Sequence, residues 1–276
     1  MNTTTEKDFE RQQERINEKM NNIKYICIVI SGKGGVGKTT FASLLIRTFN
    51  ETGKRVLAID ADPDANLAAG LGIENAADIV PISEMKELVF ERTGAQPGSI
   101  GGFFKLNPKV DDLPDALSAT FENIKLMRLG GVKKGGSGCI CPESTLLRAL
   151  VMHIVLIRDE VVVMDMEAGI EHLGRATAKA VDKLIVVVEP GRRSIDTAEH
   201  IRQLASEIGL NNIGVVGNKI RGPKDEEFLQ KHLFDFEFIG FLPYDNSLIE
   251  ADLNGVSPFD VDSPSKQQVA KMITRL

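Results

Sequence analysis

The sequence of 276 residues contains no tryptophan, two tyrosines and only three cysteines. So few cysteines do not build a disulfide-stabilised scaffold, so we expect a reducing, cytoplasmic location. No apolar run is long enough to cross a membrane, and no signal-peptide core precedes the first apolar run. The formal net charge of −6 argues against a general nucleic-acid binder, which needs a basic surface. These absences predict a protein whose partners are neither membranes nor nucleic acids.

The remaining composition is that of an ordinary globular protein, with 42% hydrophobic and 26% charged residues. The length suits one large α/β domain, or one such domain with an insertion. Residues 1–22 are polar and heavily charged, which indicates either a frayed arm or an exposed helix outside the core. We therefore expect a single domain over residues 23–276 behind a polar N-terminal arm.

Apolar runs typical of strands alternate with helical patterns along this domain. The runs are residues 26–30, 56–59, 161–164, 184–188, 213–216 and 238–241, and helical patterns include 171–181 and 194–208. Several runs are apolar throughout, as in parallel strands buried on both faces. The alternation predicts a doubly wound, mostly parallel sheet flanked by helices, with ligands bound at the carboxyl ends of the strands. Residues 91–142 are rich in glycine and proline, and we expect an insertion without a core strand there.

A phosphate-binding loop follows the first apolar run. Residues 32–40 match the pattern G-x-x-x-x-G-K-[ST], in which glycines let backbone N–H groups turn inward around an anion. The residues expected to bind nucleotide here are Gly34, Gly35, Val36, Gly37, Lys38, Thr39 and Thr40. Lys38 would neutralise the β- and γ-phosphates and Thr39 would ligate Mg²⁺. Lys33 places a second cation in the loop, where the ordinary motif needs none.

Acidic residues follow two of the other apolar runs. Asp165 ends the run 161–164 and is expected to hold Mg²⁺ through water. Of the acids in the turn after residues 56–59, Asp60 would support the metal and Asp62 would orient the attacking water, whereas Asp64 suits the cap of a helix over 65–69. The residues expected near the purine ring close the fifth and sixth runs, and they are Asn218, Lys219 and Pro243. Loop and acids together predict a Mg²⁺–nucleotide site that binds ATP or ADP.

Cys139 and Cys141 form the second motif, in a glycine-rich segment. Thiols at this spacing on extended backbone point to the same side and can share a metal ion, but two sulfurs are half of a closed four-coordinate site. A two-fold axis at this segment would bring four thiolates together, and such a site suits Zn²⁺, Cu⁺ or Ni²⁺. The alternative is two exposed loop thiols.

Residues 33–39 and 60–63 resemble the deviant-Walker-A (SIMIBI) class of dimeric ATPases, which includes MinD, ParA and the nitrogenase iron protein. In that class the early lysine, matched by Lys33, crosses the dimer interface to the partner's phosphates. The resemblance therefore implies a homodimer joined through its phosphate-loop faces. Its catalytic residues would be Lys33, Lys38 and Asp62, with Lys33 neutralising charge that develops during phosphoryl transfer.

Residues 106–111, 134–141 and 162–173 are similar to the CooC-type nickel-insertion ATPases, a family that matures carbon monoxide dehydrogenase and, in its AcsF branch, acetyl-CoA synthase. The similarity runs from about residue 24 to near the C-terminus. It implies a dimer that carries Ni²⁺ at a shared site of Cys139 and Cys141, where Zn²⁺ can replace nickel in purified samples. Glu167 departs from the family, which has glycine at that position.

Two other functions remain open at this point. A spatial-positioning ATPase of the MinD/ParA kind needs a basic face or an inserting helix, and it does not explain the cysteine pair. An electron-transfer ATPase of the nitrogenase iron-protein kind uses two cysteines per chain for a bridging iron–sulfur cluster. Those cysteines come from widely separated segments, whereas Cys139 and Cys141 lie two residues apart.

Overall fold

The computed structural model describes residues 26–74, 76–95, 105–130, 142–157, 160–170 and 173–276. The predicted N-terminal arm over residues 1–22 lies outside this described part, and so do Cys139 and Cys141. Over the described ranges, no helix combines the length and the apolar character needed to cross a bilayer.

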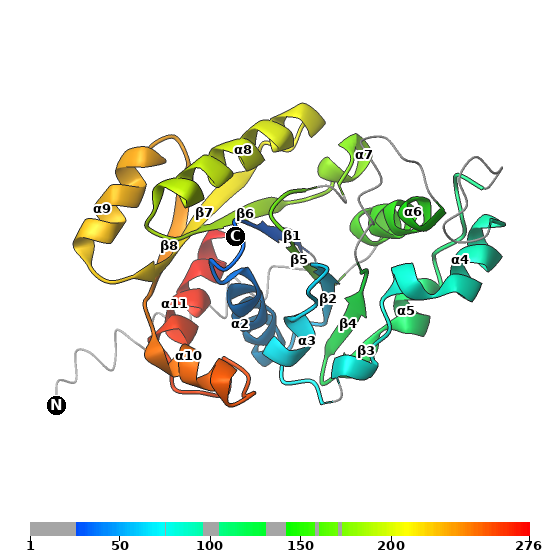
Figure 1. Ribbon diagram of the computed structural model, residues 1–276, viewed down its shortest axis with the longest axis horizontal. Coiled ribbons are helices and arrows are strands. Elements are labelled where there is room, and N and C mark those ends of the chain that lie inside the picture. The colour runs from blue at the N-terminus through cyan, green and yellow to red at the C-terminus, as the bar shows by residue number, and fades with distance from the viewer. Residues whose placement is uncertain (1–25, 75, 96–104, 131–141, 158–159, 171–172) are drawn as a thin grey trace.

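The described chain is built on one eight-stranded sheet. Figure 1 shows this sheet with helices packed against it. Its strands are β1 (Ile26–Ser31), β2 (Val56–Ala61), β3 (Ala119–Phe121), β4 (Ile124–Arg128), β5 (Val161–Met166), β6 (Lys183–Val188), β7 (Ile213–Ile220) and β8 (Glu237–Pro243). Their order is β3-β4-β2-β5-β1-β6-β7-β8. Every neighbouring pair is parallel except β3 and β4, which form an antiparallel hairpin at one edge. The predicted doubly wound sheet is confirmed, and each of the six predicted runs is one of its parallel strands.

The expectation that residues 91–142 contain no core strand is wrong. β4 lies within this range and pairs in parallel with β2, and its Ile124 and Leu126 side chains are fully buried. Lys125 and Arg128 interrupt the apolar pattern, so the strand does not read as a continuous buried run. The strand is nevertheless an interior strand of the sheet, because β2 pairs with one of its edges and β3 pairs with the other.

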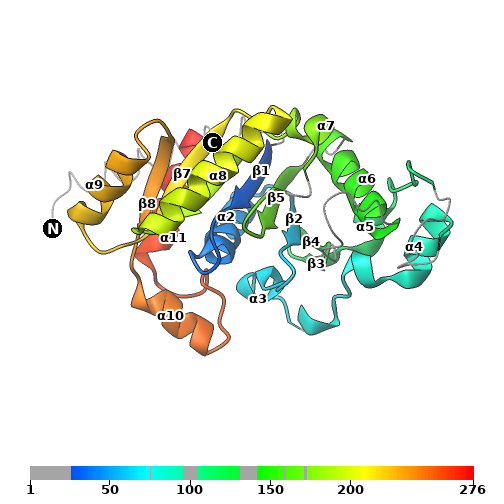
Figure 2. The same ribbon diagram turned by 45° about the horizontal axis from the view of Figure 1, so that its top comes forward.

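Helices cover both faces of the sheet (Figures 1 and 2). α2 (Lys38–Glu51), α3 (Leu67–Gly70) and α11 (Pro264–Met272) share one hydrophobic cluster, beside which lies α10 (Asn246–Leu253). The opposite cluster includes residues of α4 (Lys86–Thr93), α5 (Leu113–Leu117), α6 (Pro142–Ile157), α7 (Arg175–Ala178), α8 (Arg192–Ile208) and α9 (Pro223–His232). The predicted helix over 194–208 is confirmed as α8. Within the range 171–181, the described residues form only the short helix α7.

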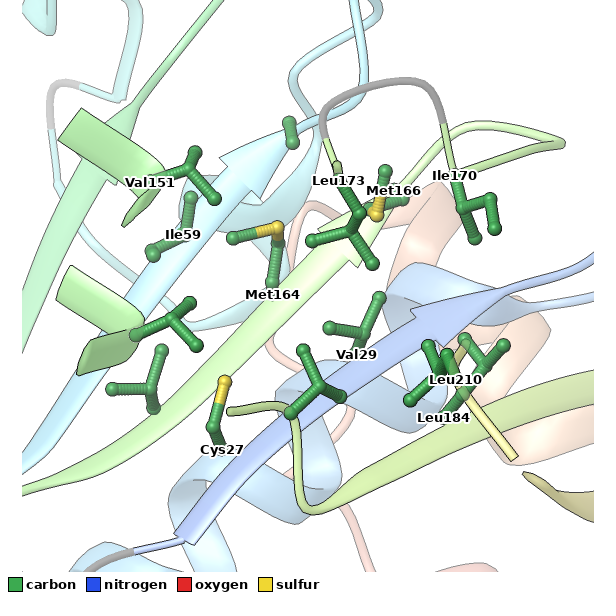
Figure 3. Close-up of a cluster of buried hydrophobic side chains, with 14 of the residues drawn as sticks. Cys27, Val29, Ile59, Val151, Met164, Met166, Ile170, Leu173, Leu184 and Leu210 are labelled. Carbon is green, nitrogen blue, oxygen red and sulfur yellow. The ribbon is translucent and has the colours of Figure 1, made fainter. Parts of the chain in front are cut away.

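Both clusters meet on β1, whose residues are all buried. Ile28 and Ile30 point into the cluster beneath α2, whereas Cys27 and Val29 point into the opposite one. Figure 3 shows Cys27 and Val29 packed in that second cluster with Met164 of β5 nearby. This two-sided burial fixes the central strands and so fixes the loops that leave their carboxyl ends.

Replacing a core residue of β4 tests the corrected sheet order. We expect Leu126→Ala to lower the free energy of unfolding by about 2–5 kcal/mol, since the side chain is fully buried in the hydrophobic cluster that includes α2. Urea denaturation measures this change. Thr120→Ala, an exposed position on β3, is the control and should change the value by no more than about 0.5 kcal/mol. Equal effects of the two substitutions would contradict the placement of β4 in the core.

Candidate functional site

The predicted phosphate loop connects β1 to α2 at the carboxyl edge of the sheet. Two of its glycines are required by close backbone approach. A Cβ atom on Gly32, whose φ is +149°, would lie 2.4 Å from the carbonyl oxygen of Val187 on β6. A Cβ atom on Gly37, whose φ is +91°, would lie 2.4 Å from the Asn218 side chain. The loop therefore lies against the backbone of β6 and the Asn218 side chain of β7, and both glycines have a positive φ that other residues rarely adopt.

The loop ends where α2 begins. Gly37 occupies the N-cap position of α2 without a side-chain cap, and the first turn carries no acidic residue. The free N–H groups and the positive end of the helix dipole therefore face the loop. Lys38, the first residue of α2, is buried and directs its ammonium back toward the carbonyl oxygen of Lys33, 3.5 Å away. This arrangement suits a phosphate group.

Two residues of β7 donate hydrogen bonds to the phosphate loop. The Asn218 side-chain amide donates to the carbonyl oxygen of Val36 at 2.7 Å, and the Lys219 ammonium donates to that of Gly35 at 2.6 Å. Pro243 ends β8 in register with Ile220, the last residue of β7. Of the predicted base-binding residues, Asn218 and Lys219 thus contact the middle of the loop, and Pro243 lies on the neighbouring strand. The structure also shows a role that the sequence did not indicate: Asn218 and Lys219 stabilise the loop conformation.

Asp60 and Asp165 are register partners on the adjacent parallel strands β2 and β5, so both side chains leave the sheet on the same side. The hydroxyl of Thr39 donates to Asp165 Oδ2 at 2.7 Å. Asp165 Oδ1 is buried and has no hydrogen-bond partner among the described residues. A buried carboxylate oxygen without a partner, beside a second carboxylate and a threonine hydroxyl, fits the oxygen ligands that Mg²⁺ requires.

Burial controls the protonation of both carboxyls. Burial, with a smaller contribution from the charge of Asp60, raises the pKa of Asp165 to about 7, although the hydrogen bond from Thr39 opposes the shift. Burial also raises the pKa of Asp60 to about 6, although the backbone N–H groups of Leu67 and Asp62 oppose the shift. Both acids therefore hold a proton more tightly than an exposed aspartate does, because burial outweighs the nearby charges of Lys38 and Arg128. A bound divalent ion would favour the ionised form of each.

Asp62 is half-exposed beside this pair, and its Oδ1 accepts a hydrogen bond from the backbone of Asp64 at 3.0 Å. The interpretation of Asp64 as a helix cap is wrong. The helix begins at Leu67 with Asn66 at the N-cap position, and Asp60 Oδ2 accepts the Leu67 N–H at 3.1 Å. Asp60 therefore satisfies an N–H group at the start of α3, and its carboxylate joins that helix to the site.

Ser31 is a site residue that the sequence analysis missed. Its hydroxyl is buried at the end of β1, within hydrogen-bonding distance of the carbonyl oxygens of Gly169 (2.8 Å) and Glu167 (3.1 Å). It also accepts the Gly169 N–H at 3.2 Å. Ser31 therefore joins the start of the phosphate loop to the segment that follows β5. A polar residue between an apolar run and a glycine-rich loop was the available signal.

Glu189 was missed as well. It follows β6 directly, and its carboxylate lies 3.3 Å from the Lys33 ammonium and 3.1 Å from that of Lys219. Both Asp165 and Glu189 directly follow a buried apolar run, so the pattern that indicated Asp165 also indicates Glu189. The second loop cation thus has a partner within its own chain.

Within the described residues, no group of three or more histidine, cysteine or acidic side chains is placed to hold a metal ion. The predicted ligands Cys139 and Cys141 lie outside these residues. Cys27 is buried in the core, and burial, with a smaller contribution from the Asp182 charge, raises the pKa of its thiol to about 12. Cys27 therefore stays protonated and does not serve as a thiolate ligand.

Asp165→Asn tests whether the site is built for a cation. In the absence of Mg²⁺, the variant should melt at a higher temperature than the unsubstituted protein. The substitution removes a buried carboxyl group whose pKa rises from 3.8 to about 7 on folding, and which therefore destabilises the folded state when it is ionised. The difference should be largest above pH 7, should shrink as the pH falls from 7 toward 3.8, and should vanish below 3.8, where the aspartate is protonated in both the folded and the unfolded states. Mg²⁺ with ADP should raise the melting temperature of the unsubstituted protein and not that of the variant.

Asp196→Asn, at an exposed position on α8, is the matched control and should leave both responses unchanged. Equal stabilisation of Asp165→Asn and the unsubstituted protein by Mg²⁺ and ADP would contradict the assignment of Asp165 to the metal site.

Comparisons with known proteins agree with this geometry. Residues 27–259 match the family described as the CobQ/CobB/MinD/ParA nucleotide binding domain. The chain is 45% identical to an uncharacterized ATP-binding protein of Methanocaldococcus jannaschii over 248 residues, which cover 89% of this chain and 95% of that protein. It is 43% identical to the carbon monoxide dehydrogenase accessory protein CooC of Rhodospirillum rubrum over 251 residues, covering 90% and 95% of the two chains.

The solved structure of the MinC:MinD cell division protein complex of Aquifex aeolicus contains a chain with the same fold. Its TM-score is 0.64 at 23% identity, and the aligned region covers 91% of this chain and 95% of that one. At that identity the likeness concerns the fold alone. The family match covers most of the chain, and both relatives align over almost their full length. The chain therefore belongs to the CobQ/CobB/MinD/ParA family of nucleotide-binding proteins.

Proposed function

We propose that this protein is an ATP-hydrolysing metallochaperone, which dimerises with nucleotide and delivers Ni²⁺ to carbon monoxide dehydrogenase or acetyl-CoA synthase. The observation that carries the proposal is the 43% identity to an accessory protein of carbon monoxide dehydrogenase over 90% of the chain. The cysteine pair and the buried carboxylate pair support it, because a nickel carrier driven by ATP needs a soft-donor site and a nucleotide site.

In the proposed nucleotide site, backbone N–H groups of residues 34–40 surround the phosphates and Lys38 neutralises the terminal ones. Thr39, Asp60 and Asp165 would hold Mg²⁺, which neutralises phosphate charge when bound. Asp62 orients the water that attacks the γ-phosphorus, and the bond to the β-phosphate oxygen breaks to release ADP and phosphate. Its half-exposed side chain beside Asp60 supports that role. Asn218, Lys219 and Pro243 would border the base.

Lys33 would complete the site of the partner chain in the dimer. The phosphoryl-transfer transition state spreads negative charge over the γ-phosphate oxygens, and a cation supplied from the partner stabilises it as an arginine finger does. Ni²⁺ is the cargo, bound by Cys139 and Cys141 of two chains. Nucleotide-driven closure would bring four thiolates together at the two-fold axis.

Substituting Lys33 tests the proposed dimeric ATPase. We expect Lys33→Ala to lower the rate of ATP hydrolysis by on the order of 10³-fold, because the missing cation acts on the transition state. The same variant should no longer form a dimer when a non-hydrolysable ATP analogue is added, as measured by analytical ultracentrifugation. Lys231→Ala removes a lysine from an exposed position on α9 and should leave both properties unchanged. A fully active, dimer-forming Lys33→Ala variant would contradict the in-trans role.

Nickel titration of the reduced, nucleotide-bound protein tests the cargo site. We expect one Ni²⁺ per two chains, and we expect Cys139→Ser to abolish this binding because half of the four-thiolate set is lost. Cys27→Ala is the control and should bind nickel normally, since Cys27 is buried and its pKa is raised to about 12. Unchanged nickel affinity in Cys139→Ser would contradict the proposed site.

A further inference from the structure

Lys33 is paired with an acid of its own chain. Its ammonium lies 3.3 Å from Glu189 Oε1, and the Lys219 ammonium lies 3.1 Å from Oε2 of the same carboxylate. Glu189 is held in place through its backbone, whose N–H donates to the hydroxyl of Ser194 at 3.1 Å in the first turn of α8. The backbone of Glu189 is therefore anchored beside the phosphate loop, and its carboxylate lies between the two lysine ammonium groups.

The two lysines differ in how firmly they are held. Lys219 also donates to the Gly35 carbonyl oxygen, and its backbone adopts φ +59°, a conformation that a residue with a side chain rarely adopts without other constraints. The Lys33 ammonium, in contrast, is held by its ion pair with the Glu189 carboxylate. Partial burial disfavours the charged form of Glu189, but hydrogen bonds from Lys219 and Lys33 outweigh it and hold the pKa of this carboxyl below its ordinary value. If Lys33 leaves, Lys219 remains to compensate the carboxylate.

We propose that Glu189 is the positioning residue for Lys33. It holds Lys33 against its own chain while nucleotide is absent and releases it when the dimer forms, with Lys219 keeping the carboxylate paired. This inference rests on the proposed in-trans role of Lys33. The side chains of Lys33 and Glu189 are 35% and 27% exposed, so the pair is weak and exchangeable. A weak restraint suits a cation that must leave, because a buried ion pair would trap it.

The restraint is tested first in the nucleotide-free protein, by the rate at which an amine-reactive reagent labels each lysine. We expect Glu189→Gln to raise the labelling rate of Lys33 about two- to fivefold, the change that loss of an exposed ion pair produces. Lys38, buried in the same loop, reports on loop unfolding and should keep its rate. Glu199→Gln, which removes an ion pair with Arg202 on α8, is the matched control and should leave the Lys33 rate unchanged.

The consequence for association is tested second, by ultracentrifugation with a non-hydrolysable ATP analogue. We expect the concentration for half-maximal dimer to be about two- to fivefold lower in Glu189→Gln than in the unsubstituted protein. Unchanged labelling of Lys33, or equal acceleration of Lys33 and Lys38, would overturn the inference. Faster labelling with unaltered or weakened dimerisation would also overturn it. If Lys33 alone is labelled faster but neither protein dimerises, the restraint by Glu189 is confirmed and the proposed dimeric function is the claim that fails.

Discussion

The site depends on two carboxylates that the sheet forces together. Asp60 and Asp165 are register partners at the carboxyl ends of adjacent parallel strands, and both are buried. Burial raises the pKa of each, and one oxygen of Asp165 has no hydrogen-bond partner among the described residues. The protein thus accepts an electrostatic cost in the absence of ligand, and a divalent cation at this point removes it. The Thr39 hydroxyl is a further oxygen donor beside such a cation, and the free N–H groups at the start of α2 suit the phosphates that would accompany it.

The phosphate loop contacts residues on, or shortly after, three strands besides its own. Ser31 binds the segment after β5, Glu189 reaches the loop from β6, and Asn218 and Lys219 support it from β7. A change in the loop on nucleotide binding therefore acts directly on these connections. The segment after β5 carries the exposed Glu167, whose carbonyl oxygen lies 3.1 Å from the Ser31 hydroxyl, so Ser31 connects the start of the phosphate loop to a residue at the protein surface.

Much of this was predictable because strong local patterns carried it. Continuous apolar runs predict the strands that are buried on both faces. The glycine spacing predicts the phosphate loop, because close contacts such as that between Gly32 and Val187 leave no room for a side chain. The β3–β4 hairpin was not predictable, since Lys125 and Arg128 break the apolar pattern and only pairing with β2 buries the strand. The partnership of Lys33 with Glu189 joins residues far apart in sequence, which no local pattern records.

In the proposed mechanism, nucleotide and nickel favour the same closed dimer. Thermodynamic linkage then requires that each ligand tighten the other by the same factor. The direct measurement is calorimetric titration of Ni²⁺ with and without a non-hydrolysable ATP analogue, together with titration of the analogue with and without Ni²⁺. We expect two equal enhancement factors, each greater than one. Nickel affinity that is the same with and without nucleotide would contradict the proposed mechanism.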